Sequence, residues 1–336
     1  MSNDAVNQSS RPPAGLPHPF GDAVLEHLRE VAGRVVAGVP GIERVMAAYF
    51  ALAEDDELLG RDPSQLAGLV DAHLAAGAVR RPGEDVVRIV TPHDEAEPWD
   101  TGGSSLVFIV TDDRPFLVDT VAMEVGRQGW SVRSLFHPQF VVERGADGAI
   151  VTMAPKGNGD AGTAESWICL EAYPELGRPA REASAALVEG VRLGLQAVRA
   201  AVDDWSAMED RLQACIQDLD SSPQPVSPGH VRNVIGLLEW LAAGHFVFLG
   251  SRDYTVDGDT FTAVPGSGLG ILRGGASAGE FHAVASADDP DILVMTKDSR
   301  RSPVHRPAWL DYVAVRTFDR DGRQIGERRF VGLLAA

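Results

Sequence analysis

Three carboxylates around a strand-to-helix turn come nearest to a reactive or binding site in this sequence. Asp112, Asp113 and Asp119 surround a turn between an apolar strand, Leu106 to Val110, and a helix that we expect to begin near Pro115. Clustered carboxylates suit Mg²⁺ or Ca²⁺, but the spacing of an EF-hand loop is absent. Capping of the helix by Asp112 or Asp113 is the simpler interpretation. Alternatively, backbone amides at the helix start hold a small carboxylate ligand.

A local excess of positive charge near the end of the chain is the second candidate. Residues 297–329 hold nine Lys or Arg residues against five Asp or Glu, whereas the whole chain has a net charge of -18. This asymmetry favours a surface that receives an acidic part of the same protein or of another subunit, and a solvated loop explains it equally well. The candidate interface residues are Lys297, Arg300, Arg301, His305 and Arg306.

The remaining reactive patterns are weak. The run Gly266 to Gly270 has the glycine content of a nucleotide-binding loop. It lacks the further glycine, the long following helix and the acidic residue of a dinucleotide site. A glycine-rich turn is therefore the better interpretation. None of the nine histidines is paired with another at the spacing of a metal site. His137 and His305 are the two histidines that we consider further. We therefore predict no catalytic, cofactor-binding or metal-binding residue in this chain.

Composition narrows the class of protein. A chain of 336 residues with 44% hydrophobic content accommodates two domains, and its acidic balance argues against nucleic acid and anionic membranes as partners. No apolar run reaches transmembrane length, and the first twenty residues do not resemble a signal peptide. Cys169 and Cys215 are expected to be buried thiols in a reducing compartment. We expect a cytoplasmic protein.

The hydrophobic pattern predicts an α+β protein. From residue 105 to 154 the order is strand, helix, strand, strand, the first two-thirds of a ferredoxin-like sandwich, with Gly129 ending the helix and Asp147-Gly148 forming a hairpin turn. A long helix follows, in which Gly190 and Gly194 favour close packing on a sheet. Shifts in composition predict five parts: a disordered tail at 1–21, helices at 22–84, the sandwich with its long helical region at 85–220, a linker at 221–228 and a smaller antiparallel sheet domain at 229–336.

Several motifs in one order resemble the N-terminal region of the large bacterial NAD-specific glutamate dehydrogenases. They run from about Ile42 to the end of the chain and are Arg114-Pro-Phe-Leu-Val-Asp-Thr-Val121, His137-Pro138, Glu165-Ser-Trp167, Ala200-Ala-Val-Asp-Asp-Trp205, His245-Phe-Val-Phe-Leu-Gly250, Gly266-Ser-Gly-Leu-Gly-Ile-Leu272, Lys297, His305-Arg-Pro307, Leu310-Asp-Tyr312 and Gly326-Glu-Arg-Arg-Phe-Val-Gly-Leu333. The resemblance implies an ACT-like first domain, then helices and a PAS-like second domain. In this family a downstream domain performs the NAD-dependent oxidative deamination of L-glutamate to 2-oxoglutarate.

The resemblance implies a regulatory and oligomer-building segment with no chemistry of its own. NAD is implied for the full-length family and no cofactor for this segment. The implied partners are the remainder of the dehydrogenase chain and other subunits. Since the chain ends ahead of any dehydrogenase domain, we expect a C-terminally truncated or fragmentary gene product.

An amino-acid effector is the remaining candidate ligand. Ligand-binding ACT domains usually have Pro-Gly-Leu where this chain has Pro115-Phe116-Leu117, and a phenylalanine there fills the space beside the backbone. The candidate effector-binding residues are Asp112, Asp113, Arg114 and Phe116. The alternative function is a free-standing amino-acid sensor module of ACT type.

Overall fold

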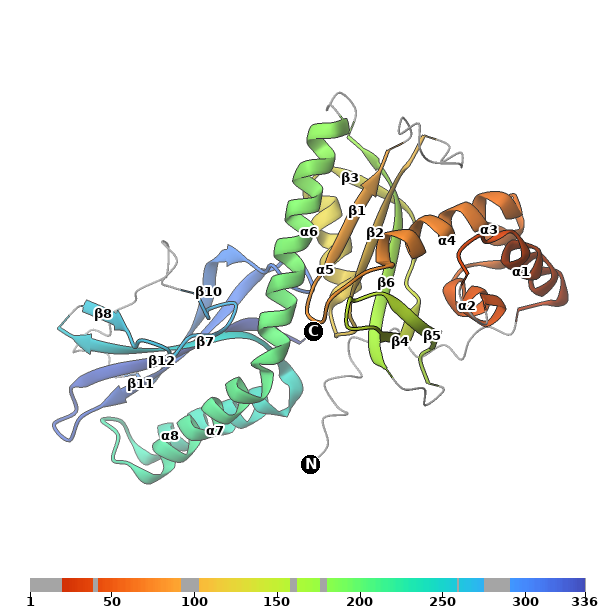
Figure 1. Cartoon of the computed structure of the whole chain (residues 1–336). Helices are drawn as coiled ribbons and strands as arrows, with labels where there is room; N and C mark the ends of the chain where they lie inside the picture. Colours follow the sequence, from red (N-terminus) through yellow and green to blue (C-terminus); the bar gives the residue numbers. More distant parts are fainter. Residues whose placement is uncertain are drawn as a thin grey trace. The chain divides into compact units, whose positions relative to one another are not determined.

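The computed structural model describes residues 20–38, 42–91, 103–157, 162–175, 180–258, 260–274 and 291–335. They form two compact units, divided between Leu195 and Gln196. Each unit combines helices with one antiparallel sheet, which confirms the predicted α+β class (Figure 1). The predicted disordered tail lies outside the described residues, apart from Phe20 and Gly21.

Four helices gather on one side of the sheet in the first unit (Figure 1). They are α1 (Asp22–Arg34), α2 (Ile42–Tyr49), α3 (Asp55–Leu59) and α4 (Pro63–Gly77). The start of α4 follows from its sequence, because the Asp62 side chain accepts a hydrogen bond from the Ser64 amide at 2.8 Å and Pro63 opens the first turn. Apolar side chains of all four helices share one core with the sheet.

The first sheet has the ferredoxin-like pairing. Its strands are β1 (Val86–Val90), β2 (Ser105–Asp112), β3 (Trp130–Phe136), β4 (Gln139–Arg144), β5 (Ile150–Pro155) and β6 (Thr163–Pro174). The order is β1-β2-β6, and the far edge of β6 pairs with β3 along one half and with β4 along the other. The edge beside β2, which the usual motif fills with its last strand, is taken by β1. The sequence pattern predicts a single strand over 132–142 directly after the helix, but the structure has two strands there, β3 and β4, divided at His137-Pro138.

Two further helices, α5 (Leu117–Arg127) and α6 (Ala180–Asp203), lie on the other face of this sheet (Figure 1). Because both faces are covered, β2 is buried along almost its whole length. A Cβ on Gly190 of α6 would lie 2.0 Å from Glu124 Oε1, and one on Gly194 would lie 3.1 Å from Thr120 Cγ2. The lack of a side chain at these two glycines therefore allows α5 to pack closely against α6. The expectation that they pack on a sheet is wrong. Gly129 ends α5 at φ 79°, as predicted.

A histidine in the first core makes the stability of the unit depend on pH. His73 of α4 is fully buried, where its Nδ1 lies 2.7 Å from the Tyr49 hydroxyl and its Nε2 lies 3.2 Å from the Ile109 carbonyl oxygen. Burial lowers the pKa of His73 to about 3. The folded state therefore keeps the neutral ring while the unfolded chain takes up a proton below its ordinary pKa of about 6.5.

We expect the free energy of unfolding to fall as the pH falls from about 6.5 towards 3, by about 1.4 kcal/mol per pH unit from this residue. Urea titrations at several pH values measure the slope. His73→Gln should be less stable at neutral pH and should show a shallower loss on acidification. An equal slope in the variant and the natural chain would contradict the assignment.

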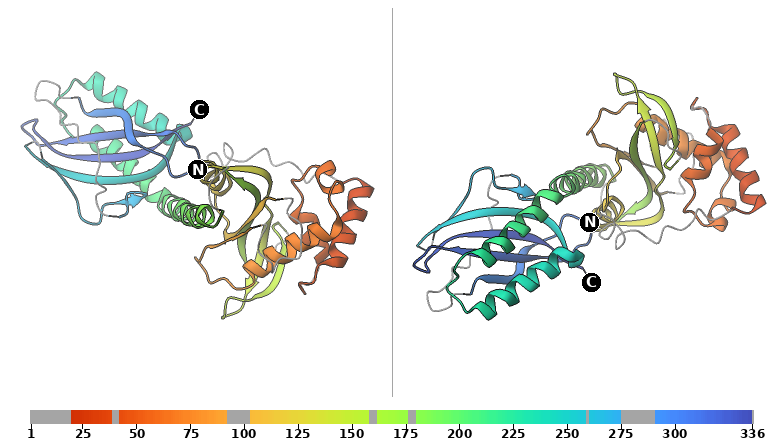
Figure 2. Two further views of the ribbon diagram at one scale, coloured as in Figure 1. Left: turned by 90° about the horizontal axis from the view of Figure 1, so that it is seen from above. Right: turned by 90° about the horizontal axis from the view of Figure 1, so that it is seen from below.

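The second unit has a sheet of order β10-β11-β12-β7-β8, with β9 also paired to β7. Its strands are β7 (Phe246–Asp257), β8 (Thr260–Ala263), β9 (Leu269–Gly270), β10 (Leu293–Arg301), β11 (Trp309–Phe318) and β12 (Gln324–Leu334). Two neighbouring helices, α7 (Trp205–Ser221) and α8 (Pro228–Trp240), pack on one face (Figure 2). A π-helical turn, η2 (Leu241–His245), joins α8 to β7. The antiparallel sheet predicted after residue 228 is present, and it has six strands like the first sheet.

The division between the units differs from the predicted linker at 221–228. Met208, Leu212 and Cys215 of α7 are buried in the core of the second unit, so α7 belongs with the second sheet. The proline-bearing segment after α7 is a connection inside that unit. Among the helices that the structure describes, none has both the length and the apolar character needed to span a bilayer.

Candidate functional site

The first predicted site lies where β2 ends and the chain turns into α5. Asp112 is the last residue of β2, and one of its carboxylate oxygens accepts a hydrogen bond from Arg80 Nη2 at 2.8 Å. Arg114 lies 4.0 Å from the other oxygen. Because Arg80 is only 1% exposed, Asp112 forms the outer end of a buried ionic cluster.

Glu165 of β6 is the centre of that ionic cluster. Its carboxylate has no solvent exposure and accepts hydrogen bonds from Arg80 Nη2 at 2.8 Å and from Arg144 Nε and Nη2 at 2.7 and 2.9 Å. Trp167 Nε1 donates to it at 3.1 Å. The two guanidinium groups also donate to backbone carbonyls, Arg80 Nη1 to Glu84 O at 2.9 Å and Arg144 to Gly148 O and Gly77 O at 2.8 and 3.0 Å. With every group paired, the cluster fixes the ends of α4, β4 and β6 and offers no free acid or base.

Asp113 has a separate set of partners. Its Oδ1 accepts hydrogen bonds from Gln139 Nε2 at 2.8 Å and from Ser166 Oγ at 2.6 Å. Its Oδ2 forms an ion pair with Lys156. The Asp113 amide donates to the Ala164 carbonyl at 2.9 Å. The carboxylate of Asp113 is therefore held by β4, by β6 and by the end of the β5 hairpin.

Ser166 places Asp113 and His137 in one hydrogen-bonded chain. His137 Nε2 lies 3.1 Å from Ser166 Oγ, and the only hydroxyl hydrogen of Ser166 goes to Asp113, so His137 Nε2 is the donor. Burial lowers the pKa of His137, and the nearby Asp113 opposes this. A serine nucleophile needs an accepting histidine and an exposed oxygen. Ser166 is fully buried and has neither, so the chain of contacts is structural.

Phe116 holds the backbone conformation that a glycine would adopt easily. It precedes α5 with φ 70° and ψ 1°, in the left-handed region, and its side chain is 7% exposed. Neither Asp112 nor Asp113 caps the helix, because the residue at the cap position is Phe116 and no side-chain hydrogen bond is formed there. The capping prediction is therefore wrong. The expectation that a phenylalanine fills the space at the turn agrees with its burial.

Sequence patterns did not indicate the partners that complete this site. Arg80, Arg144, Gln139 and Lys156 come from distant parts of the chain and lie in no motif. The one signal was Glu165-Ser-Trp167, whose first two residues meet Arg80 and Asp113. Among the residues with described positions, no group of three His, Cys, Asp or Glu side chains is arranged to hold a metal ion.

The candidate interface residues lie on β10 and on the connection to β11. Lys297 pairs with Asp311 at 2.6 Å, and Arg300 pairs with the buried Asp298 at 2.7 Å. Arg306 Nη2 donates to the Leu334 carbonyl at 2.5 Å, and His305 has a positive φ of 72°. Part of the predicted excess of positive charge is therefore engaged in contacts within the second unit.

Arg301 has a different environment. Its guanidinium lies 4.7 Å from the ring centroid of Trp309, which is 47% exposed, and its Nη1 donates to the Pro307 carbonyl at 2.7 Å. Another arginine of the basic stretch is internal, since Arg329 is 2% exposed and lies 3.9 Å from the ring centroid of Tyr254. This region therefore exposes an arginine stacked on a tryptophan.

The two other features raised by the sequence have structural roles. In the glycine-rich turn, Gly266 and Gly270 have positive φ, and a Cβ on Gly268 would lie 2.2 Å from the Leu272 carbonyl oxygen. The glycines are required by the tight packing of this turn. Cys169 and Cys215 are buried free thiols, as predicted, and burial raises the pKa of both.

A known family model matches the first unit. The glutamate dehydrogenase ACT1 domain covers residues 45–184, which include the greater part of α2, the helices α3 and α4, the whole first sheet and the β2–α5 turn. The fold and the match to the family model agree. Together they define the class of protein, an ACT-type α+β domain followed by a second unit built on an antiparallel sheet.

Known proteins extend the match to most of the chain. An NAD-specific glutamate dehydrogenase of Pseudomonas aeruginosa is 31% identical over 338 residues, 96% of this chain and 20% of the relative. Those of Halomonas elongata and Mycobacterium tuberculosis are 30% and 26% identical, over 74% and 80% of this chain and 16% of each relative. The chain thus belongs with the N-terminal region of the NAD-specific glutamate dehydrogenase family. It spans a fifth or less of the length of these relatives.

Proposed function

We propose that this chain is a regulatory and oligomer-building segment of an NAD-dependent glutamate dehydrogenase. The parent reaction converts L-glutamate and NAD to 2-oxoglutarate, ammonium and NADH, and the segment itself contributes no catalytic group. Its partners are the remainder of such a dehydrogenase and other subunits. The PAS-like assignment of the second unit is part of the proposal and rests on the family resemblance.

The observation that supports this proposal best is the structure of the β2–α5 turn, in which the carboxylate of Asp113 is already paired and Phe116 is buried. Asp113 is satisfied by Gln139, Ser166 and Lys156, and the Phe116 side chain of the same turn is buried. A carboxylate that already accepts several hydrogen bonds has little capacity left for a ligand ammonium group. A turn of this kind supports a scaffold better than an amino-acid pocket.

The rival function, a free-standing amino-acid sensor that binds at Asp112, Asp113, Arg114 and Phe116, makes a different prediction in calorimetry. We expect titration with L-glutamate to give no heat that depends on Asp113. Any saturable signal should be equal in the natural chain and in Asp113→Asn, which retains the shape of the side chain. A saturable signal abolished by Asp113→Asn would favour the sensor.

The surface that we propose for contact with other subunits lies at the β10 edge of the second sheet. The strand order ends at β10, so one side of this strand is unpaired by the described strands. Trp309 and Met295 are 47% and 40% exposed there, and Arg301 stacks on Trp309. Tryptophan and arginine are the residue types that most often dominate binding energy at interfaces, and open strand edges readily accept another chain.

We expect Trp309→Ser to weaken self-association of the chain by about tenfold or more. Sedimentation velocity over a range of concentrations measures the dissociation constant. Trp240→Ser is the matched control, because Trp240 is 44% exposed and stacks on His245 at the end of α8 and is part of neither β10 nor β11. Equal association constants for the two variants would remove Trp309 from the proposed interface.

A further inference from the structure

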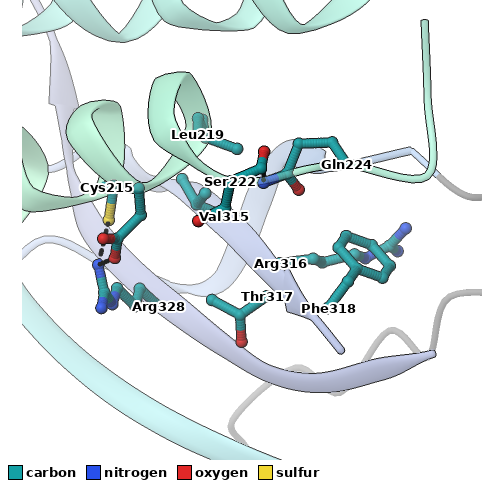
Figure 3. A pocket seen from close by; sticks show the side chains of 10 residues that line it. Cys215, Leu219, Ser222, Gln224, Val315, Arg316, Thr317, Phe318 and Arg328 are labelled. Carbon is teal, nitrogen blue, oxygen red and sulfur yellow. Dashed lines mark hydrogen bonds and ion pairs between the residues drawn. The ribbon is translucent and has the colours of Figure 1, made fainter. Parts of the chain in front are cut away.

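A pocket of about 190 Å³ opens in the second unit between the end of α7 and strand β11 (Figure 3). Cys215, Leu219 and Ser222 of α7 and its cap line one wall together with Gln224, and residues 315–318 of β11 line the other. Since one water occupies about 30 Å³ in the liquid, the pocket has room for several waters or one compact organic molecule. None of the candidate effector or interface residues lines it.

Two polar atoms of the lining residues are buried and have no hydrogen-bond partner among the described residues. Arg316 is only 6% exposed, and its Nη1 donates to the Asp291 carbonyl at 2.7 Å, but its Nε has no acceptor. Gln224 donates from Nε2 to the Ser222 carbonyl at 3.2 Å, which leaves its Oε1 without a donor. Buried polar groups in folded proteins are normally paired. We therefore expect a bound molecule to supply the missing hydrogen bonds of this donor and this acceptor.

The charges of the pocket favour a ligand that carries one carboxylate. Arg328, at the end away from Arg316 in Figure 3, is neutralised by Asp218 at 2.8 Å and also donates to Cys215 Sγ at 3.7 Å. Arg316 is paired with a backbone carbonyl and with no carboxylate among the described residues. One uncompensated guanidinium therefore remains, and planar carboxylates match the geometry of a guanidinium.

We infer that this pocket binds a small monocarboxylate that also carries a hydrogen-bond donor, that is, an α-amino or α-hydroxy acid. Its carboxylate accepts from Arg316 Nε, and its ammonium or hydroxyl group donates to Gln224 Oε1. Both buried atoms are then satisfied by one molecule. The inference goes beyond the assembly role proposed above and does not depend on it, because binding is measured directly.

Three probes of one size test the inference on the full 336-residue chain: L-alanine, L-lactate and propionate. NMR titrations should show saturable binding of L-alanine and L-lactate. Propionate should bind about tenfold more weakly, since it leaves Gln224 Oε1 without a donor. Absence of saturable binding for all three probes would overturn the inference, as would equal affinity for all three.

Variants locate the binding. Arg316→Lys keeps the positive charge but removes Nε, and it should weaken L-alanine and L-lactate by about tenfold. Gln224→Leu should abolish the advantage of L-alanine over propionate. Arg320→Lys, on the exposed β11–β12 hairpin, is the control and should bind as the natural chain does. Unchanged affinities in both Arg316→Lys and Gln224→Leu would contradict the site. If Arg316→Lys fails to fold, as judged by circular dichroism, the probe series and Gln224→Leu still test the proposed binding site.

Discussion

Glu165→Gln is expected to lower the free energy of unfolding by about 3–5 kcal/mol, because it removes the charge that pairs two arginines in the first unit. Arg80 is 1% exposed and Arg144 is largely buried, so neither guanidinium recovers its hydration when Glu165 becomes neutral. Equilibrium unfolding in urea, with the slope compared between variants, measures the change.

Glu30→Gln is the matched control for this charge. Glu30 pairs with Arg34 at 2.5 Å, but the two side chains are 53% and 45% exposed. Exposed pairs of this kind contribute little to stability, so the control should be close to the natural chain. Similar small effects for Glu165→Gln and Glu30→Gln would contradict the view that the buried cluster holds α4, β4 and β6 together.

Substitution of Phe116 is expected to reverse the usual order of alanine and glycine. Phe116→Ala removes a buried ring and should destabilise the fold by about 3–5 kcal/mol. Phe116→Gly removes the same ring, yet it should be more stable than Phe116→Ala by about 1 kcal/mol, since glycine adopts a φ of 70° without strain.

Phe140 provides the comparison. It is fully buried in β4 and is not among the described residues with positive φ. Phe140→Gly should be less stable than Phe140→Ala, because glycine weakens a strand interior. The same order of alanine and glycine at both positions would show that the backbone at Phe116 is not held in the left-handed region.

The order of helices and strands could be predicted from local patterns. The apolar run of β2, the helical stripe after Pro115 and the glycine at position 129 each specify a few neighbouring residues, and the structure confirms all three. Gly148 likewise has the positive φ that the predicted hairpin turn requires. Such signals lie within one element and need no knowledge of its partners.

The partners of the turn residues could not be predicted in this way. Asp112 meets Arg80 and Asp113 meets Lys156, and no periodicity connects residues so far apart. An aspartate before a helix therefore suggested a cap, whereas long-range ion pairs decided its role. The same limit applies to α7, whose apolar stripe shows that it is buried but not on which sheet it packs.

Sedimentation velocity of the unmodified chain tests the assembly role most directly. We expect the average sedimentation coefficient to rise with concentration through the micromolar range and to reach that of a dimer or a larger oligomer. A single species of monomer mass at every concentration, up to the limit of solubility, would contradict the proposal that this segment joins subunits.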